Sequence, residues 1–458
     1  MAHRDELPMR IGPLQVLRLA WPILISMLSF TAMIVVDSIF VGQLGTAPLA
    51  ALGLAAPAVF LLFAFGLGLI RGVKIVVAQR VGAGDEAAVE RGLWQMLWLA
   101  TGFGLLLAVL APLGRPIFVL MGGGPEVIAF AVPYFVVRAL GAPLTLARHG
   151  VSAWLEGQGD MRTPMVATLL ANGLNIVLDP IFIFGWGPVP RMETGGAALA
   201  TVLAVGVAGL FLAWRVARRD GPEVGRGLDR RLMASVWWVG SPLGMRQLLE
   251  VGAWAVFVSM LARVGEEHLA AHVVVMRIVS VSFLPGLAVG EAGSVLVGQA
   301  LGARKPWLAE QAWRASVRLA VVMMTVGAAL FLAIPEALLA PFGVEGDVLA
   351  LGRELLVLAA LFQLFDAVAM VAQTILTGAG DTRFVLVSAV SVAWAFNLPI
   401  AWLLAVHWQL GAPGAWLALT LEIALTAALC AGRIAGGRWL QVGAAMVEAD
   451  NAEMAVAA

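Results

Sequence analysis

Charged residues are scarce in this chain of 458 residues, at 13% of the total compared with about 25% in an ordinary soluble protein. The hydrophobic content of 61% is typical of a membrane protein instead. Cysteine is nearly absent, and the single Cys430 excludes an intramolecular disulfide framework. Because 29 basic residues balance 29 acidic ones, the net charge does not indicate nucleic acid as a partner.

Motifs for catalysis are also missing. The sequence contains no HExxH, no GxSxG and no paired catalytic histidines, so we expect no enzyme and no cofactor. The glycine-rich stretches GQGD and GAGD follow no strand-like segment, and they are predicted to be tight turns rather than phosphate-binding loops.

Apolar runs of 18 or more residues recur from about Leu14 to Ala431, each long enough to cross a hydrocarbon layer of roughly 30 Å as a helix. The period-2 alternation of a β-barrel is absent. The first 13 residues are polar and the run after them is too long for a signal-peptide core, so we expect a retained first helix. Twelve helices are predicted, at about 14–44, 48–79, 92–113, 125–152, 164–186, 194–216, 234–263, 268–300, 314–340, 350–377, 384–407 and 413–433.

The basic residues alternate between the loops of these helices. One side of the membrane receives 19 of them, including the cluster from Arg215 to Arg231, and the other side receives 4. The positive-inside rule therefore predicts that both termini are cytoplasmic, which requires an even number of helices.

The chain also repeats itself at a lag of about 220 residues. Pro22 of WPILI matches Pro242 of SPLGM, GTAPLAA matches GEEHLAA, AQRVGA matches GQALGA, and LEGQGD matches LTGAGD. We therefore predict an all-α integral membrane protein of two pseudo-symmetric six-helix bundles in a parallel repeat. The expected parts are an N-lobe at 1–216, a cytoplasmic linker at 217–233, a C-lobe at 234–433 and a cytoplasmic tail at 434–458. Two such bundles around a central cavity are typical of transporters.

Four acids deep inside the predicted helices have no acidic counterpart in the other half. They are Asp37, Asp179, Glu250 and Asp366, which meet Phe257, Ile400, Phe30 and Thr145 respectively. A residue that only supports the scaffold should tend to recur in both halves, whereas a single working site need not. Since an acid at the centre of a membrane helix costs about 2.5–3.5 kcal/mol, we interpret these four as functional.

The first pair predicts a cation site in the N-lobe. At 1.5 Å per residue, Asp37 and Asp179 lie at similar depth in helices 1 and 5. Asn175 shares a face with Asp179, and Thr201 lies level with them in helix 6. Pro180 cannot donate a backbone hydrogen bond, so we expect a local kink that frees a carbonyl. These oxygens suit Na⁺, and the carboxylates alone suit a proton.

The second pair, Glu250 and Asp366, falls near the predicted midplane and suggests a second acidic site in the C-lobe. A simpler interpretation stays open for all four acids. A basic neighbour such as Arg138, Arg246 or Arg277 would neutralise an acid, which would then serve only packing.

In these motifs the sequence resembles the multidrug and toxic compound extrusion (MATE) family over nearly its whole length. The similarity is carried by WPILI, VDSIFVGQLG, NIVLDPIFIFG, GGAALAT and FQLFDAVAMVAQTILTGAGDTR. The resemblance implies a secondary antiporter in a bacterial inner membrane. Such a protein works by alternating access as a monomer and expels organic cations or amphipathic drugs in exchange for H⁺ or Na⁺.

The resemblance also assigns residues. The family's N-lobe cation site maps onto Asp37, Asn175, Asp179 and Thr201. Its C-lobe acidic site, prominent in the NorM-like branch, maps onto Glu250 and Asp366, whereas the Asn-x-x-x-Asp-Pro pattern is similar to the DinF-like branch. The alternative from the same superfamily is a flippase for a lipid-linked oligosaccharide. Such a protein needs a basic cavity for its pyrophosphate, whereas the unpaired candidates here are mainly acidic. The basic residues Arg71, Lys74, Arg138 and Arg246 keep this alternative open.

Overall fold

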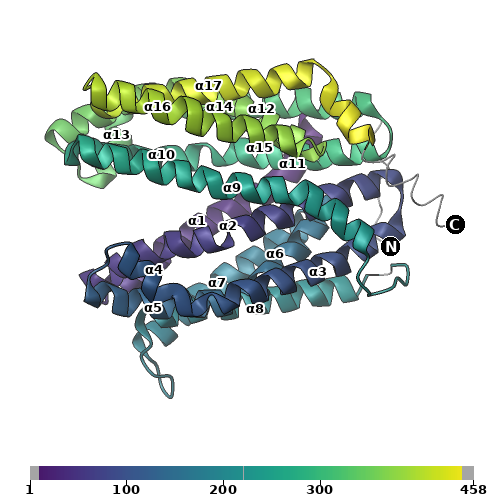
Figure 1. Ribbon diagram of the computed structural model, residues 1–458, viewed down its shortest axis with the longest axis horizontal. Helices are drawn as coiled ribbons and strands as arrows, with labels where there is room; N and C mark the ends of the chain where they lie inside the picture. The colour runs from purple at the N-terminus through teal and green to yellow at the C-terminus, as the bar shows by residue number, and fades with distance from the viewer. Residues whose placement is uncertain (1–9, 220, 446–458) are drawn as a thin grey trace. The chain divides into compact units, whose positions relative to one another are not determined.

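α-Helices form nearly all of residues 10–219 and 221–445, the part of the chain that this computed structural model describes (Figure 1). The first half contains α1 Pro13–Gly42, α2 Thr46–Ala83, α3 Glu86–Val109, α4 Gly114–Leu120, α5 Pro125–Leu140, α6 Ala142–Gly157, α7 Arg162–Phe184 and α8 Glu193–Ala217. The second half contains α9 Arg230–Val264, α10 Glu266–Ser282, α11 Leu284–Gly302, α12 Pro306–Ala333, α13 Pro335–Leu339, α14 Gly346–Gly378, α15 Thr382–Ser391, α16 Leu398–Ala401 and α17 Gly411–Ala435. Short 3₁₀ turns precede α4 and follow α13, at Ala111–Leu113 and Ala340–Phe342, and π-helical turns flank α16 at Val392–Asn397 and Trp402–His407.

The predicted membrane-spanning architecture is confirmed. Within the described residues, 11 helices are long and apolar enough to cross a membrane, or up to 12 when the bent pair of α5 and α6 counts as one span. Their order follows the twelve predicted segments along the chain.

Two of the predicted helices break in their interior, and a third, 314–340, ends at Ala333 before the short α13, so the prediction was wrong there. The segment 125–152 breaks at Gly141 into α5 and α6, which are bent by 52°. The segment 268–300 breaks at Phe283 into α10 and α11. In both cases a proline, Pro143 or Pro285, is the second residue of the following helix. Proline lacks the N–H that would continue the preceding helix, and its ring clashes with the carbonyl four residues earlier.

The described chain divides into two compact units. The N-terminal unit contains Ile25–Gly244, and the C-terminal unit contains residues 10–24 and 245–445. Two helices, α1 and α9, therefore belong partly to each unit. The division follows Pro22 in α1 and Pro242 in α9, the two prolines that the sequence repeat aligns. The predicted lobe limits of 1–216, 217–233, 234–433 and 434–458 stay a prediction.

The repeated GQGD and GAGD stretches are turns, as predicted, and they make the same ion pair in both units. Gly159 and Gly380 have φ angles of 85° and 86°, in the left-handed region that favours glycine. The aspartate that follows pairs with an arginine at the end of the unit's last long helix. Arg219 donates to Asp160, and Arg433 Nε donates to Asp381 Oδ2 at 2.8 Å. The pair closes the cytoplasmic end predicted for each bundle.

The segment between α8 and α9 is attached to α3. Gln95 Nε2 donates to the Gly227 carbonyl, and the Asp229 N–H donates to Gln95 Oε1, both at 2.9 Å. Trp98 Nε1 donates to the Arg226 carbonyl at 3.0 Å. The C-terminal part of the predicted linker is therefore held against the N-terminal unit.

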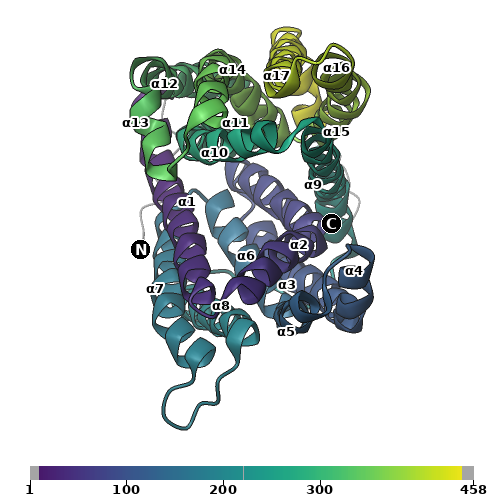
Figure 2. The same ribbon diagram turned by 90° about the vertical axis from the view of Figure 1, so that its left-hand side faces the viewer.

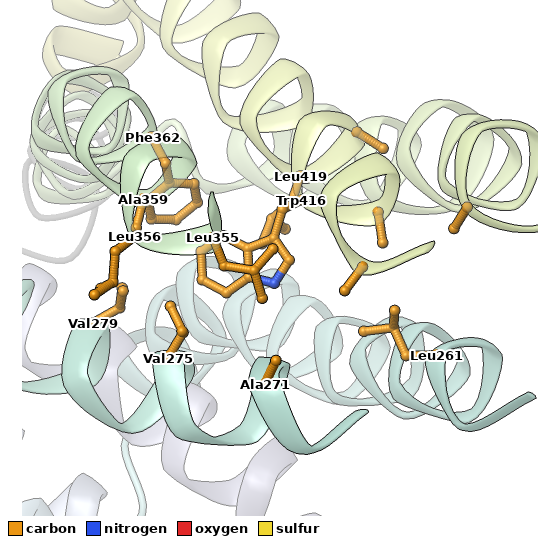
Figure 3. Close-up of a cluster of buried hydrophobic side chains, with 14 of the residues drawn as sticks. Leu261, Ala271, Val275, Val279, Leu355, Leu356, Ala359, Phe362, Trp416 and Leu419 are labelled. Carbon is orange, nitrogen blue, oxygen red and sulfur yellow. The ribbon is translucent and has the colours of Figure 1, made fainter. Parts of the chain in front are cut away.

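Trp416 of α17 is the centre of the apolar core of the C-terminal unit. Its indole is fully buried and lies beside Leu355 of α14, as Figure 3 shows. The indole N–H donates to His272 Nδ1 of α10 at 3.2 Å. This side chain therefore joins three helices by packing and by one polar contact.

Trp416→Ala should destabilise the protein by about 3–5 kcal/mol, because it removes a fully buried aromatic ring and leaves a cavity. Trp307→Ala is the matched control, since Trp307 is 55% exposed. Thermal unfolding of the purified variants in detergent measures both. Equal melting temperatures for the two variants would contradict the central role of Trp416.

Arg433→Gln should also destabilise the protein, because the Asp381 side chain is only 6% exposed and would lose its charged partner. Breaking a buried ion pair by removing one partner costs about 3–5 kcal/mol. Arg438→Gln removes an exposed charge nearby and should leave the unfolding temperature within error of the original protein. Similar losses in both variants would show that the Arg433 pair has no special role.

Candidate functional site

Two acidic side chains, Asp37 of α1 and Asp179 of α7, meet inside the N-terminal unit. Their carboxyl groups lie within hydrogen-bonding reach of each other. Asp179 is fully buried and accepts a hydrogen bond from Asn175 Nδ2 at 3.1 Å. Two ionised carboxylates in contact repel each other, so a proton or another cation stabilises the pair. The structure thus brings together three of the four residues predicted for the N-lobe site.

Three buried oxygen atoms at this point have no hydrogen-bond donor among the described residues. They are Asp37 Oδ1, Asn175 Oδ1 and Asp179 Oδ2. Nearly all buried polar atoms in folded proteins are paired, so three unpaired ones in one place require an explanation. All three are acceptors, and a proton or a cation supplies what an acceptor lacks.

Helices α1 and α7, which overlap in the view of Figure 2, contact each other before and after the carboxyl pair along their length. Asn172 Nδ2 donates to Ser29 Oγ at 2.7 Å, two helical turns before the carboxyl pair. Beyond the pair, the rings of Phe40 and Phe184 pack edge to face with centroids 6.5 Å apart. Residues of the small apolar cluster there are Val41, Ile183 and Ala197. The carboxyl pair therefore lies between a hydrogen bond and an apolar cluster.

Thr201 and Pro180, which were predicted to belong to the site, are placed differently. The Thr201 hydroxyl donates to the carbonyl of Ala197 in its own helix at 3.0 Å, and it makes no hydrogen bond to the other three site residues. α7 continues through Pro180 to Phe184 without a break. The ring removes one backbone donor, which leaves the Ile176 carbonyl without its usual partner. A role for either residue in ion binding stays a prediction.

Tyr134 and Arg138 of α5 lie within electrostatic range of the carboxyl pair. Arg138 was considered only as a basic neighbour of an acid, and Tyr134 was not predicted at all. One signal in the sequence was available. The two residues are four apart on an apolar helix and therefore share a face. A tyrosine one turn from an arginine inside a span indicates a polar face directed at other polar groups.

The second predicted site is not assembled in the C-terminal unit. Glu250 forms an ion pair with Arg246 one turn earlier in α9, with 2.6 Å between Oε1 and Nε. This is the neutralised arrangement that the sequence left open. Asp366 is buried in α14, and it makes no hydrogen bond or ion pair with another side chain among the described residues. Glu422 of α17, and not Asp366, is the acid within electrostatic range of Glu250.

Comparison with known proteins decides the family. The profile of the MatE family matches the chain twice, at residues 22–181 and 242–403. The chain belongs to the MatE family. The two matched stretches begin 220 residues apart, which is the lag of the internal repeat. Family membership confirms the predicted all-α membrane fold and the prediction of an ion-coupled antiporter rather than an enzyme.

Individual relatives agree over nearly the full length. The chain is 32% identical to the protein of Deinococcus radiodurans named "Probable multidrug resistance protein NorM", over 91% of this chain and 94% of the relative. It is 30% identical to a Pseudomonas putida protein of the same name, over 90% and 91%. The solved outward-facing structure of a multidrug resistance MATE family transporter superimposes with a TM-score of 0.85 and 26% identity, covering 96% of this chain and 97% of the other. The protein is thus a multi-pass membrane transporter.

The Ser29–Asn172 hydrogen bond should contribute about 0.6–1.7 kcal/mol of coupling, the range measured for side-chain hydrogen bonds between membrane helices. A double-mutant cycle with Ser29→Ala, Asn172→Ala and the double variant measures it by unfolding in detergent. Fully additive effects would show that α1 and α7 are not joined at this level.

Proposed function

We propose that this transporter exports organic cations or amphipathic drugs and that the Asp37–Asp179 pair binds the coupling ion. The contact between the two carboxyl groups is the observation that carries the proposal. Two acids in contact, together with three unpaired acceptor oxygens, form a place where one positive charge is strongly stabilised. The names of the relatives, which describe multidrug resistance, support drugs as the exported class.

A proton is the ion that this geometry favours. Two carboxyl groups within reach of each other can form a hydrogen bond only when one of them carries a proton. Sodium is the alternative, since Asn175 Oδ1 adds a neutral oxygen to the two acids and hard cations prefer oxygen ligands. Arg138 lies within electrostatic range of Asp37. Its positive charge disfavours binding of two cations at the Asp37–Asp179 pair and so supports binding of one.

Exchange of drug for ion follows because the cationic drug and the coupling ion compete for the negative charge of the carboxyl pair. An unloaded pair attracts a cationic drug, whereas a pair that has bound its ion has lost most of that attraction. Ion binding then favours drug release, because a ligand shifts a conformational equilibrium only by its difference in affinity for the two states. Rocking of the two bundles in turn exposes the site to each side of the membrane, which is the alternating access expected for a parallel-repeat transporter.

The remaining predictions complete the proposal. The distribution of basic residues supports cytoplasmic termini in a bacterial inner membrane, and we propose a monomer. Glu250 and Asp366 remain a proposed second acidic site, with Glu422 added because it is the acid near Glu250. The flippase alternative is less well supported than efflux, given the match to multidrug relatives.

Asp37→Asn should abolish ion-driven efflux while leaving folding intact, because it removes one of the two charges that hold the ion. The measurement uses purified protein in liposomes and follows efflux of a fluorescent organic cation under a proton gradient alone and then a sodium gradient alone. Asp347→Asn, which changes an exposed acid in the first turn of α14, is the matched control and should retain efflux.

Efflux by the Asp37→Asn variant at the original rate under both gradients would remove this pair from the mechanism. Efflux driven only by sodium in the original protein would keep the site and replace the proton as its ion.

A further inference from the structure

The N-terminal unit contains three arginines in its spans for which no ion pair with a carboxylate is present among the described residues. They are Arg71 of α2, Arg138 of α5 and Arg148 of α6. A charged group inside a membrane span is costly, and it is normally paired or functional. Lys74 differs, because its Nζ lies 3.8 Å from Glu156 Oε2.

Arg148 is buried, with only 9% of its surface exposed. Its Nη2 donates to Thr168 Oγ1 at 2.6 Å, and its Nη1 lies 3.5 Å from His149 Nε2. His149 Nδ1 lies 2.8 Å from the Thr145 carbonyl, which can only accept, so the ring proton is on Nδ1 and Nε2 is an acceptor. Arg148 Nε has no hydrogen-bond acceptor in the part of the chain that the structure describes. Both hydrogen-bonding partners of Arg148 are thus neutral, and Glu156 is an acid within its electrostatic range without an ion pair between them.

Arg138 is even less satisfied. Its buried Nε and Nη1 have no acceptor among the described residues. Its guanidinium lies 5.8 Å from the centre of the Phe63 ring of α2, which is a weak substitute for an anion. Asp37 is within electrostatic range, but the hydrogen-bonding partner of its carboxyl group is Asp179.

His149 is common to the three arginines. All three guanidinium groups lie within electrostatic range of its ring. Buried donors without acceptors, on groups that keep their positive charge, require an acceptor that carries negative charge. A guanidinium offers its N–H groups as a planar fork that fits carboxylate and phosphate oxygens.

We propose that Arg138 and Arg148 form an oxyanion subsite in the N-terminal unit, which binds the carboxylate or phosphate of an amphiphile. The identification of the ligand as an exported molecule rests on the proposed function. When the amphiphile is the exported molecule, its cationic group lies at Asp37–Asp179 and its oxyanion at the arginines. The preferred substrates are then zwitterions. Arg138 lies near both parts, because it is within electrostatic range of Asp37 and of His149.

A matched pair of dyes tests the subsite: a rhodamine with a free carboxylate and the methyl ester of the same dye. Binding of each is measured by fluorescence polarisation to the full-length protein in liposomes of phosphatidylcholine. The original protein should prefer the carboxylate dye by about tenfold, which corresponds to about 1.4 kcal/mol. Arg138→Gln should abolish this preference. Arg148→Lys keeps the charge, protects the fold and should reduce the preference through loss of the fork.

Arg115→Gln removes an exposed arginine from the same unit and should keep the preference. Adding phosphatidylglycerol to the liposomes distinguishes the two sources of the oxyanion. Loss of the carboxylate preference, restored by returning to phosphatidylcholine, would support the subsite and identify a lipid phosphate as its occupant. An unchanged preference would support it and identify the exported molecule.

The inference is overturned if the original protein binds both dyes equally in both lipids, or if Arg138→Gln and Arg115→Gln change the preference alike. Transport of the ester dye under an ion gradient, measured in parallel, separates this result from the proposed function. Ester efflux without a carboxylate preference would contradict only the subsite. A preference that depends on Arg138, without any gradient-driven efflux, would contradict only the antiport mechanism.

Discussion

Inside a hydrocarbon layer, every polar group must find its partner within the protein, because no water is available to it. Most of the chain meets this constraint locally. The hydroxyls of Thr31, Ser38, Thr201 and Ser259 each donate to the carbonyl one turn earlier in their own helix. Against this background, a buried polar atom without a partner is a rare event. In the N-terminal unit such atoms include acceptors of the acidic site on α1 and α7 and arginine donors on α5 and α6.

The two halves share a scaffold but differ in how they treat charge. In the C-terminal unit, Glu250 is neutralised by Arg246 on the same helix. In the N-terminal unit, the acids face each other across two helices, and the nearest arginine does not pair with them. Duplication thus supplied two similar bundles, each closed by the same turn and arginine. The two acids that lie within hydrogen-bonding reach of each other are in the N-terminal unit.

The sequence was sufficient for much of this, since the apolar runs are long and the repeat is strong. It predicted the order of the helices and the pairing of Asp37 with Asp179, because depth along a helix can be counted at a fixed rise per residue. It was not sufficient for the breaks at Gly141 and Phe283. Proline also occurs within unbroken helices here, such as α2 and α7, so proline alone does not decide where a helix ends.

The direction in which a side chain points around its helix axis was equally hard to predict. Thr201 lies at the right depth, yet its hydroxyl bonds to its own backbone instead of the acids. Glu250 and Asp366 were matched by depth alone, and the structure gives each a different environment. Tyr134 and Arg138 were missed as site residues because sequence spacing shows which residues share a face, but not what that face meets.

The division of α1 between the two units has a mechanical consequence. The first turns of this helix belong to the C-terminal unit, and the residues from Ile25 onward belong to the N-terminal unit. Asp37 lies 15 residues after Pro22 on the same helix, or about 22 Å along its axis. Asp37, the acid proposed to bind the ion, therefore lies far along the same helix from the proline near which the two units divide. A change in the direction of α1 at Pro22 would displace the Asp37 carboxyl group, because the helix is continuous between the two residues.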